Sequence, residues 1–495
     1  MSKQTFLAVD LGAESGRVMA GHWDGRSMAI EEVHRFPNGP MEIAGTLRWD
    51  VLRLWNEILT GLGLAGKRFG GAIRSVGVDA WGVDYTLLSK SGELLGLPFC
   101  YRDARTLGVL DRMFDRVPRE EIFAQTGVQF MEINTLPQLC AANERNPEIL
   151  AVVDCFLTIP DFVNWCLTGV RVCEFTNATT TQCLNAQTRG WATGLIEKLG
   201  LPTRIFPEVV APGTKLGRLR SEIALMTGLT NTGVVAPATH DTGSAVVGVP
   251  TEATGSTKWA YISSGTWSLM GLEVPHAILS QRALELNVTN EGGVDGCYRL
   301  LKNIPGMWLL QKCRKAFEDR GTRLEYAELI VLAEKAVPFR TLINPDAPAF
   351  LNPPDMPEAI RQFCLKTGQP APESEGAFAR CALESLALKY ALVLRWLEEL
   401  SGDRVEVIHI VGGGSRNGLL NQFTANACQR TVLAGPVEAT TMGNLLMQAR
   451  TFGEIGSLAE LRCSVRQSAP VTRFEPEVRS IAAWSDALGR FRSLP

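Results

Sequence analysis

The chain has 495 residues, of which 45% are hydrophobic and 20% are charged, and its formal net charge is −3. A single hydrophobic core stops growing at roughly 250 to 300 residues, so two domains are expected. The nearly balanced charge gives no electrostatic reason to bind nucleic acid or an anionic membrane surface, and the composition is typical of a soluble globular protein.

The amino terminus and the cysteines predict the compartment in which the protein works. The opening residues MSKQTFLAVDLG contain no apolar run of signal-peptide length, and no later run approaches the roughly 18 apolar residues of a membrane span. The 12 cysteines occur singly, without a CxxC pair or a Cys/His cluster at metal-binding spacing. We therefore predict a cytoplasmic protein with buried, reduced thiols and without a disulfide framework or a zinc site.

The first predicted elements are three strands, a helix and a further strand. The runs TFLAVDLG, RVMAGHW and SMAIEEVHRF are separated by short turns and predict an antiparallel meander within residues 1–36. Asp50 is a candidate N-cap, because the apolar residues from Val51 to Leu62 follow the i, i+3, i+4, i+7 spacing of an amphipathic helix. The run AIRSVGVDAWG then predicts a return strand. This order favours an α/β domain.

A second α/β unit is predicted to begin near residue 255. There YISSGTWSLMGL has the pattern of a strand and a turn, and the segment from Glu375 to Leu400 has the periodicity of a long helix. The run VEVIHIVGGGSRNGLLNQFTANA predicts a buried strand, a glycine loop and a helix that begins near Asn417. The segment GVPTEATGS, residues 248–256, is the best candidate for the crossing between the two domains.

Three loops at predicted strand ends are candidate phosphate-binding loops. They are DLGAESGR (residues 10–17), SSGTWS (263–268) and VGGGSR (411–416), in which glycines let backbone N–H groups approach a phosphate closely. Each loop taken alone is more often a plain turn, and neither the Walker pattern nor the Rossmann pattern is present. Three such loops in two α/β halves are nevertheless what a nucleotide held between two lobes requires.

The motif THDTGS supplies a candidate catalytic carboxylate. Asp241 lies among small residues and can accept the proton of an attacking hydroxyl, as carboxylates do in kinases, while His240 can donate a hydrogen bond to the substrate. The same position also allows Asp241 to cap the helix predicted after it, and the motif alone leaves both interpretations open. The motifs WGVD and YRDAR place an aromatic side chain beside polar groups, which suits a sugar, although each alone is more often a strand end with a solvated salt bridge.

A series of motifs follows in order along nearly the whole chain: DLGAESGR, DAWGVD, YRDAR, NATTTQ, ATHDTGSA, SSGTWSLMG, TNEGG, LKNIPGMWLLQ, HIVGGGSRN and GPVEATTMGN. Together they resemble the FGGY family of carbohydrate kinases, and WGVD, SSGTWSL and the LKN segment are similar to the branch of that family that acts on L-rhamnulose. The resemblance implies an α/β protein with two ribonuclease-H-like domains, as in actin and hexokinase, flanking a cleft. The implied domains are an N-terminal, sugar-binding domain over residues 1–248 and a C-terminal, nucleotide-binding domain over residues 256–495.

The implied activity is transfer of the γ-phosphoryl group of ATP to the 1-hydroxyl of L-rhamnulose, with Mg²⁺, in rhamnose catabolism. The implied partners are the sugar and ATP, and the protein is expected to be a monomer or a small homo-oligomer. Carried over residue by residue, the resemblance makes Asp241 the proton acceptor and lets Asp10 meet Mg²⁺ through water. It assigns the sugar to Gly82, His240, Asp241, Thr242 and Asn303, and ATP to Ala13, Glu14, Ser15, Gly16, Arg17, Thr266, Gln311 and Gly413.

The sequence departs from the family pattern at two places, and two alternatives stay open. Glu14 stands where the family loop usually carries a small residue, and we expect its side chain to point outward; the segment INTLPQL lacks the lysine of the general family signature. One alternative is a kinase for another ketose, such as L-fuculose or L-xylulose, with the same mechanism. The other is a nucleotide-dependent conformational switch of the actin and chaperone kind, against which Asp241 beside a sugar-like pocket argues.

Overall fold

The computed structural model describes residues 4–495, so Met1–Lys3 of the opening stretch considered above lie outside the described residues. The chain divides into two compact units. The first contains the chain up to Gly255 together with Glu273–Leu300 and Ala439–Ala469, and the second contains Ser256–Leu272, Leu301–Glu438 and Pro470–Pro495. Each unit is therefore assembled from segments that are distant in sequence. Among the described residues, no helix is long and apolar enough to cross a membrane.

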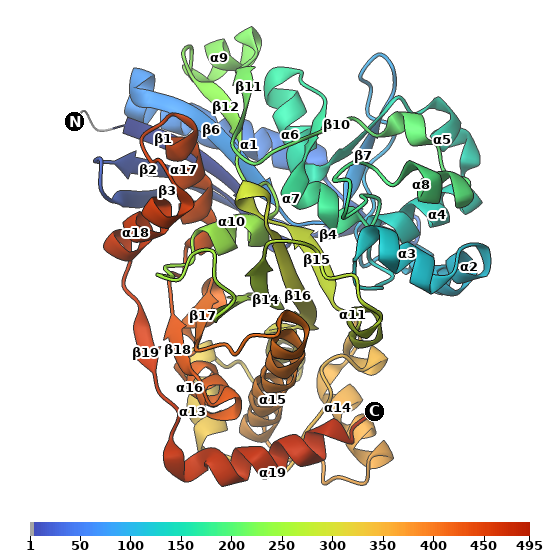
Figure 1. Cartoon of the computed structure of the whole chain (residues 1–495), viewed down its shortest axis with the longest axis vertical. Coiled ribbons are helices and arrows are strands. Elements are labelled where there is room, and N and C mark those ends of the chain that lie inside the picture. Colours follow the sequence, from blue (N-terminus) through green and yellow to red (C-terminus); the bar gives the residue numbers. More distant parts are fainter. Residues whose placement is uncertain (1–3) are drawn as a thin grey trace. The chain divides into compact units, whose positions relative to one another are not determined.

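The first unit is built on a six-stranded mixed sheet with the order β11-β12-β6-β1-β2-β3 (Figure 1). The predicted meander is confirmed, since β1, β2 and β3 are successively antiparallel, and β6 and β12 continue the sheet in parallel to β1. Strand β11 is an antiparallel edge. The strands are β1 (Gln4–Leu11), β2 (Ser15–Trp23), β3 (Met28–Pro37), β6 (Ile73–Ala80), β11 (Thr214–Arg218) and β12 (Gly233–Ala236).

Helices and short strands surround this sheet. The helices are α1 (Val51–Phe69), α2 (Val109–Arg116), α3 (Arg119–Thr126), α4 (Thr135–Arg145), α5 (Pro147–Val152), α6 (Ile159–Thr168), α7 (Phe175–Ala178), α8 (Thr193–Lys198), α9 (Ser221–Thr227), α10 (Asp241–Val247), α11 (Gln281–Leu286), α17 (Ala439–Thr451) and α18 (Leu458–Ser468). The short strands are β4 (Pro40–Ile43), β5 (Thr46–Trp49), β7 (Tyr85–Leu88), β8 (Cys155–Thr158), β9 (Val172–Glu174), β10 (Glu208–Val210) and β15 (Thr289–Gly292). The predicted cap of α1 is confirmed, because Asp50 Oδ1 accepts a hydrogen bond from Arg53 N at 3.0 Å.

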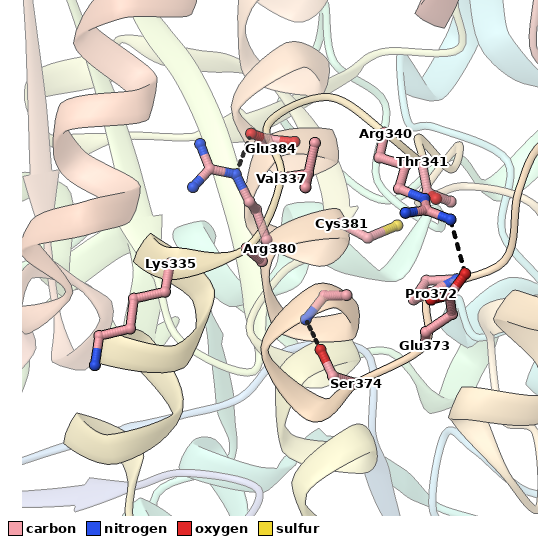
Figure 2. Close-up of a pocket in the computed structure, with 12 residues that line it drawn as sticks. Lys335, Val337, Arg340, Thr341, Pro372, Glu373, Ser374, Arg380, Cys381 and Glu384 are labelled. Atoms are coloured by element: carbon pink, nitrogen blue, oxygen red, sulfur yellow. Dashed lines mark hydrogen bonds and ion pairs between the residues drawn. The ribbon is translucent and has the colours of Figure 1, made fainter.

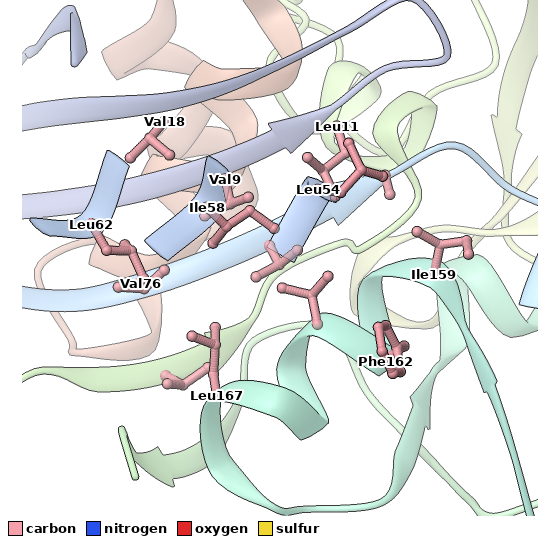
Figure 3. Packing of buried hydrophobic residues seen from close by; sticks show 14 of the residues in the cluster. Val9, Leu11, Val18, Leu54, Ile58, Leu62, Val76, Ile159, Phe162 and Leu167 are labelled. Carbon is pink, nitrogen blue, oxygen red and sulfur yellow. The ribbon is translucent and has the colours of Figure 1, made fainter. Parts of the chain in front are cut away.

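Successive side chains of β1 pack into two different cores. Val9 and Leu11 meet α1 and α6 on one face of the sheet, where all the labelled side chains of Figure 3 are buried. Phe6 and Ala8 point to the other face and pack in a second cluster with residues of α17 such as Leu445. Helix α17 comes from near the end of the sequence, yet it lies against the amino-terminal strands (Figure 1). Both faces of β1 are therefore covered, which explains its continuous apolar run.

The sheet of the second unit repeats the topology of the first. The sheet has seven strands in the order β15-β16-β14-β13-β17-β18-β19, and the six strands from β16 to β19 match the order β3-β2-β1-β6-β12-β11 of the first sheet. Strand β13 is antiparallel to β14 and parallel to β17, β17 is parallel to β18, and β19 is again an antiparallel edge. The strands are β13 (Trp259–Ser264), β14 (Trp267–Val274), β16 (Tyr298–Pro305), β17 (Val407–Val411), β18 (Thr431–Ala434) and β19 (Thr472–Phe474). The predicted α/β organisation of both halves is confirmed.

The helices of the second unit are α12 (Trp308–Asp319), α13 (Tyr326–Lys335), α14 (Met356–Lys366), α15 (Glu375–Ser401), α16 (Gly418–Cys428) and α19 (Ile481–Arg492). The long predicted helix is α15, which begins at an N-cap, Ser374, and ends before Gly402, whose φ of 77° suits glycine. Helix α16 begins next to Asn417, as predicted, and Asn417 Oδ1 caps it by accepting a hydrogen bond from Leu420 N at 3.0 Å. The 12 cysteines are free, also as predicted, and burial raises the pKa of thiols such as Cys428, to about 12.

Candidate active site

Three carboxylates gather at the carboxyl edge of the first sheet. Asp10 near the end of β1 and Asp79 near the end of β6 are partners in the parallel register, and both side chains are buried. The chain that follows β12 returns to the same edge, where His240 forms a bridge with Ala80 and is followed by Asp241. In open α/β sheets, ligands bind outside the carboxyl ends of the strands, so this edge is the place to look for chemistry.

Asp241 combines a partly accessible carboxylate with an environment that favours its protonation. It is the first residue of α10, and His240 rather than Asp241 occupies the N-cap position. Its Oδ1 accepts a hydrogen bond from Thr242 N at 2.5 Å, whereas Oδ2 accepts none from residues 4–495. The side chain is 31% exposed. Burial raises the pKa of Asp241 above its ordinary value; His240 opposes the rise and Asp10 adds to it.

His240 is held by two buried residues of the segment 289–300. Its Nδ1 lies 3.2 Å from the Arg299 guanidinium and 3.3 Å from Glu291 Oε2, and these two partners are themselves 3.1 Å apart. Nδ1 therefore faces both a donor, the Arg299 guanidinium, and an acceptor, the Glu291 carboxylate. The other ring nitrogen, Nε2, lies 3.3 Å from Asp241 Oδ1. The motif TNEGG signalled this place in the sequence, but neither Glu291 nor Arg299 could be linked to His240 from sequence alone.

Burial by itself would raise the pKa of Glu291, but Arg299 and His240 outweigh it and hold that pKa below its ordinary value. Glu291 is therefore an ionised partner for the Arg299 guanidinium, and the fully buried Arg299 also donates to the carbonyl of Gly292 at 2.9 Å. This paired charge fixes the ring of His240 from the side opposite Asp241.

Asp10 is held from two directions. Its Oδ2 accepts hydrogen bonds from Arg17 at 2.5 Å and from the Thr441 hydroxyl at 3.0 Å. Asp10 and Arg17 are also direct partners across the β1–β2 hairpin. The guanidinium that the sequence assigned to a phosphate therefore contacts Asp10 in this structure, while its role toward ATP stays a prediction.

Asp79 is a second buried acid beside Asp10 that sequence reasoning did not select. Its Oδ2 accepts a hydrogen bond from Asn444 at 2.6 Å, and its Oδ1 is buried without a hydrogen-bond partner among residues 4–495. Burial, reinforced by the charge of Asp10, raises the pKa of Asp79 well above its ordinary value. Only the run VDAWG hinted at it, as an acid that follows a buried strand.

The donor set at this edge fits Mg²⁺. This ion prefers oxygen ligands, keeps several waters and commonly binds one or two carboxylates together with substrate phosphates. Asp10 and Asp79 offer such oxygens, and the orphaned Asp79 Oδ1 lacks a partner that a bound cation or its water would provide. Within residues 4–495, no group of three His, Cys, Asp or Glu side chains is placed to hold a metal without further ligands. The site therefore suits an ion shared with phosphates.

The predicted phosphate contacts Ala13 to Arg17 lie in the turn after β1 and, from Ser15 on, in the first residues of β2. Glu14 is exposed, which confirms the expectation that its side chain points outward. Gly12 N donates to Ser15 O at 2.9 Å and closes the turn. A side chain at Gly16 would meet the Phe36 ring at 2.2 Å, so packing of β2 on β3 requires this glycine.

In the second unit, the predicted nucleotide residues lie on loops that touch one another. The turn of residues 264–266 between β13 and β14 accepts hydrogen bonds from Met307 N and Trp308 N. These two residues lie at the start of α12, the helix that carries Gln311. A side chain at Gly414 would lie 2.0 Å from Ser264 Oγ, so the glycine loop after β17 packs against the same turn. Gly413, by contrast, is exposed with open space at its Cβ position.

Two buried polar atoms mark this region of the second unit. Gln311 Oε1 and Ser264 Oγ have no hydrogen-bond partner among the described residues. Buried polar atoms are rarely left unpaired, so both are candidates for contact with a ligand. Asn303, the predicted sugar contact of this unit, is half-buried near the end of β16. The predicted residues are thus distributed over both units: Asp10, Ala13–Arg17, Gly82 and residues 240–242 in the first, and Thr266, Asn303, Gln311 and Gly413 in the second.

The motif WGVD is structural in a way that its sequence did not reveal. Asp84 is fully buried, and its Oδ2 accepts hydrogen bonds from Trp49 Nε1 at 2.5 Å and Trp81 Nε1 at 3.0 Å. Its Oδ1 accepts from Gln138 at 3.0 Å. Burial raises the pKa of Asp84 to about 6 in spite of these donors. Asp84 therefore anchors the loop from inside the protein, and within residues 4–495 it forms no solvated salt bridge, the common alternative considered for this motif.

A cavity of about 190 Å³ in the second unit lies away from these loops (Figure 2). It is lined by residues between Lys335 and Glu384, none of which belongs to the predicted site. Four of its charged side chains are paired with one another, since Arg380 Nε donates to Glu384 Oε1 at 2.7 Å and Arg340 donates to Glu373 at 2.7 Å. We assign this cavity no part in the chemistry.

Comparison with known proteins is consistent with this geometry. The profile of the FGGY family of carbohydrate kinases, N-terminal domain, matches residues 5–248, and that of the C-terminal domain of the same family matches residues 260–452. A protein of Bacteroides thetaiotaomicron named rhamnulokinase is 45% identical over 99% of this chain and 99% of its own length. A rhamnulokinase of Pectobacterium atrosepticum is 44% identical over 97% of this chain and 95% of its own.

Solved structures share the fold at low sequence identity. A gluconate kinase from Lactobacillus acidophilus superposes with a TM-score of 0.81 at 15% identity, covering 99% of this chain and 97% of that chain. A Plasmodium falciparum glycerol kinase solved with ADP gives a TM-score of 0.77 at 15% identity over 99% and 97%. The predicted two-domain α/β fold is thereby confirmed. With both family profiles matched and full-length relatives above 40% identity, the chain belongs to the FGGY family of carbohydrate kinases.

Proposed function

We propose that the protein transfers the γ-phosphoryl group of ATP to the 1-hydroxyl of L-rhamnulose, giving L-rhamnulose 1-phosphate and ADP. The names of the full-length relatives support the substrate, and the carboxylate edge of the first unit supports the chemistry. Because ATP is an intracellular substrate, we place the reaction in the cytoplasm, and we expect a monomer or a small homo-oligomer. Residues 1–248 would form a sugar-binding domain that also carries the ATP contacts 13–17, and residues 256–495 would form a nucleotide-binding domain that also carries the sugar contact Asn303.

One observation carries this proposal: Asp241 keeps a carboxylate oxygen available. Only Oδ1 is committed to protein donors, and the side chain is 31% exposed although the residues around it are buried. A residue that served only as a helix cap would occupy the N-cap position, which belongs to His240. The available Oδ2 can accept the proton of the sugar 1-hydroxyl as its oxygen attacks phosphorus.

The neighbours of Asp241 have matching roles. His240 holds Asp241 Oδ1 through Nε2, and Gly82, Thr242 and Asn303 would orient the sugar. Proximity and orientation of this kind account for a large share of rate enhancement in phosphoryl transfer. Asp241 also has a raised affinity for the proton, which helps it to act near neutral pH.

The nucleotide would contact the loop of residues 13–17 and, in the second unit, Thr266, Gln311 and Gly413. Asp10 and Asp79 would hold Mg²⁺ through its waters, and this ion would supply neutralisation of the phosphate charge. Arg17 is already ion-paired with Asp10, so it can fix that carboxylate as well as add positive charge near a phosphate.

The test is an ADP-release assay with ATP and L-rhamnulose, run beside L-fuculose, L-xylulose and a reaction without sugar. We expect the highest kcat/KM with L-rhamnulose and a phosphate ester on carbon 1 by NMR of the product. A higher kcat/KM for another ketose would overturn the substrate. ATP turnover that no ketose changes would overturn the kinase itself and favour a nucleotide-dependent switch.

A further inference from the structure

A buried run of hydroxyl side chains lies directly behind the proposed sugar site. The segment EFTNATTTQ, residues 174–182, forms α7 and the single 3₁₀ turn η3 (Thr179–Thr181) in the first unit. Thr176, Thr179, Thr180 and Thr181 are each at most 4% exposed. A buried hydroxyl costs free energy unless it is hydrogen-bonded, so the partners of these four groups show what the segment holds together.

Each of these hydroxyls donates its proton within the segment. Thr179, Thr180 and Thr181 donate to the carbonyls three residues earlier, at 3.0, 2.8 and 2.6 Å. Thr176 donates to Glu174 Oε2 at 2.5 Å. A hydroxyl has one proton and two lone pairs, so with the proton committed locally it can only accept from other groups.

Three of the four hydroxyls accept from backbone N–H groups of three other segments of the chain, two loops and the end of β15. Thr180 Oγ1 accepts from Val83 N at 3.1 Å, in the WGVD loop. Thr176 Oγ1 accepts from His240 N at 3.2 Å, in the THDTGS loop. Thr179 Oγ1 accepts from Gly292 N at 2.7 Å, next to Glu291.

Among the described residues, the fourth hydroxyl, that of Thr181, accepts only from Cys183 N, at 3.1 Å and two residues further along the chain. Thr181 therefore has the same side chain as Thr176, Thr179 and Thr180 and is equally buried, but among residues 4–495 its hydroxyl accepts no hydrogen bond from another segment. It provides a matched internal control.

The Val83 contact is the most informative, because Val83 has φ of 67°. A β-branched residue in the left-handed region is strained and persists only where its surroundings fix it. The Thr180 hydroxyl is one such restraint, and the Thr135 hydroxyl, which donates to Val83 O at 2.6 Å, is another. Close packing adds to them, since a side chain at Gly82 would lie 2.9 Å from Thr180 Oγ1.

Glu174 holds the backbone next to the proposed catalytic base, Asp241. It is fully buried, and its Oε2 also accepts from Thr239 N at 2.9 Å and from the Thr239 hydroxyl at 2.8 Å. The backbone of the two residues before Asp241 is thus held by Glu174, directly at Thr239 and through Thr176 at His240.

We propose that Thr180 is a positioning residue for the sugar, acting through the Val83 N–H and Gly82, and that Thr176 with Glu174 positions the base, acting through residues 239 and 240. The proposal rests on the proposed function, because it assigns Gly82 to the sugar and Asp241 to proton transfer. It separates two effects: loss of the Thr180 acceptor weakens ketose binding, and loss of the Thr176 acceptor slows turnover.

The experiment compares Thr180→Val, Thr180→Ser, Thr176→Val and the control Thr181→Val. Valine keeps the shape of threonine without its hydroxyl, and serine restores the hydroxyl. KM for each substrate, kcat and the thermal midpoint are measured, and sugar binding is measured by calorimetry with L-rhamnulose.

We expect Thr180→Val to raise both the KM and the Kd for the ketose about 10- to 100-fold, the usual effect of misplacing a substrate contact, with the ATP KM within about 2-fold. Thr180→Ser should return most of the affinity. Thr176→Val should lower kcat about 10-fold or more with a smaller change in ketose Kd. Thr181→Val should leave all kinetic constants within about 2-fold.

The proposal is overturned if folded Thr180→Val binds the ketose as tightly as Thr181→Val does. If Thr180→Val does not fold, Thr180→Ala removes the acceptor without adding a methyl group against the loop, and unchanged ketose binding in folded Thr180→Ala would overturn the proposal as well. Assays of the wild type separate this result from failure of the proposed function. If the wild type prefers another ketose, the variants are measured with that ketose. If the wild type turns over no ketose, the proposed function fails and the positioning role fails with it.

Discussion

The two sheets share one topology but present different chemistry at the same edge. In the first unit the hairpin strand β1 and its parallel neighbour β6 place Asp10 and Asp79 in register. In the second unit the equivalent pair, β13 and β17, places Ser263 beside Val411, and glycines and hydroxyls follow. A repeated fold therefore does not repeat a function, because function resides in the side chains and turns at the strand ends.

The strand ends of the first unit are distinguished by their charge, and those of the second unit by the space around their backbone. Asp10 contributes to the raised pKa of Asp79 and of Asp241, so the first unit concentrates negative charge that a cation or a proton must balance. The loop that begins at Gly412, whose φ is 84°, instead brings bare backbone to the surface at Gly413. The first strand end is therefore crowded with charge, whereas the second leaves backbone open to close approach.

The largest effect is expected at Asp241. Asp241→Asn keeps the shape of the side chain but cannot accept the proton of the sugar hydroxyl, so kcat should fall roughly 10²- to 10⁴-fold with little change in the thermal midpoint. The control is Asp50→Asn, which alters a genuine N-cap in the same unit and should be almost silent, because Asn caps about as well as Asp. Near-normal turnover in folded Asp241→Asn would remove the base assignment.

A smaller effect on turnover is expected when Asp79 is changed. Asp79 is one of the two carboxylates that distinguish the ends of β1 and β6 from the ends of β13 and β17. Asp79→Asn removes a carboxylate beside Asp10 and should weaken Mg²⁺ roughly 10-fold or more, measured by calorimetry with ADP present and by the Mg²⁺ dependence of turnover. Its folded pKa is raised, so the charged form destabilises the fold at neutral pH, and the same change should raise the thermal midpoint.

The control for Asp79 is Ser75→Ala on the same strand, whose hydroxyl donates to Gln448 at 2.6 Å but lies away from the strand end. Ser75→Ala should lower stability without changing Mg²⁺ affinity. Equal Mg²⁺ affinity in Asp79→Asn and the wild type would contradict the metal role.

In the second unit, two neighbouring glycines separate nucleotide contact from packing. Gly413→Ala adds a methyl group in open space and should raise the ATP KM by about 3- to 10-fold without lowering the thermal midpoint. Gly414→Ala pushes against Ser264 Oγ, 2.0 Å away, and should lower the thermal midpoint as well. An unchanged ATP KM in Gly413→Ala would show that the nucleotide does not lie on this backbone.

The smallest effect is a pH dependence of stability in the first unit. Burial raises the pKa of Asp161 from 3.8 to about 8, so between these values the folded state binds more protons than the unfolded state and stability falls as the pH rises. Asp161→Asn should lessen the fall of the thermal midpoint between pH 6 and 9, with roughly 2 to 4 °C for each kcal/mol recovered. A parallel fall in both proteins would show that Asp161 is not the group responsible.

Local pattern allowed the elements and the motif residues to be predicted. The meander, the Asp50 cap, the long helix from Glu375 and the glycine loop before Asn417 all depend on residues close in sequence, and each is present. Asp241 could be selected because a carboxylate among small residues is visible in the sequence itself. The partners of these groups are distant: Glu291 and Arg299 reach His240, and Glu174 reaches Thr239, across 50 or more residues.

The sequence by itself therefore determined two α/β units, the family and the candidate base, because periodicity, capping and motif spacing are local properties. Only the tertiary structure decided which buried groups meet. It placed Asp79 beside Asp10 through strand register, turned Asp84 into a buried anchor, and brought α17 to the first sheet from the far end of the chain. Hydrogen-bond partners and pKa values depend on burial and on distances set by the complete fold, and no local pattern contains them.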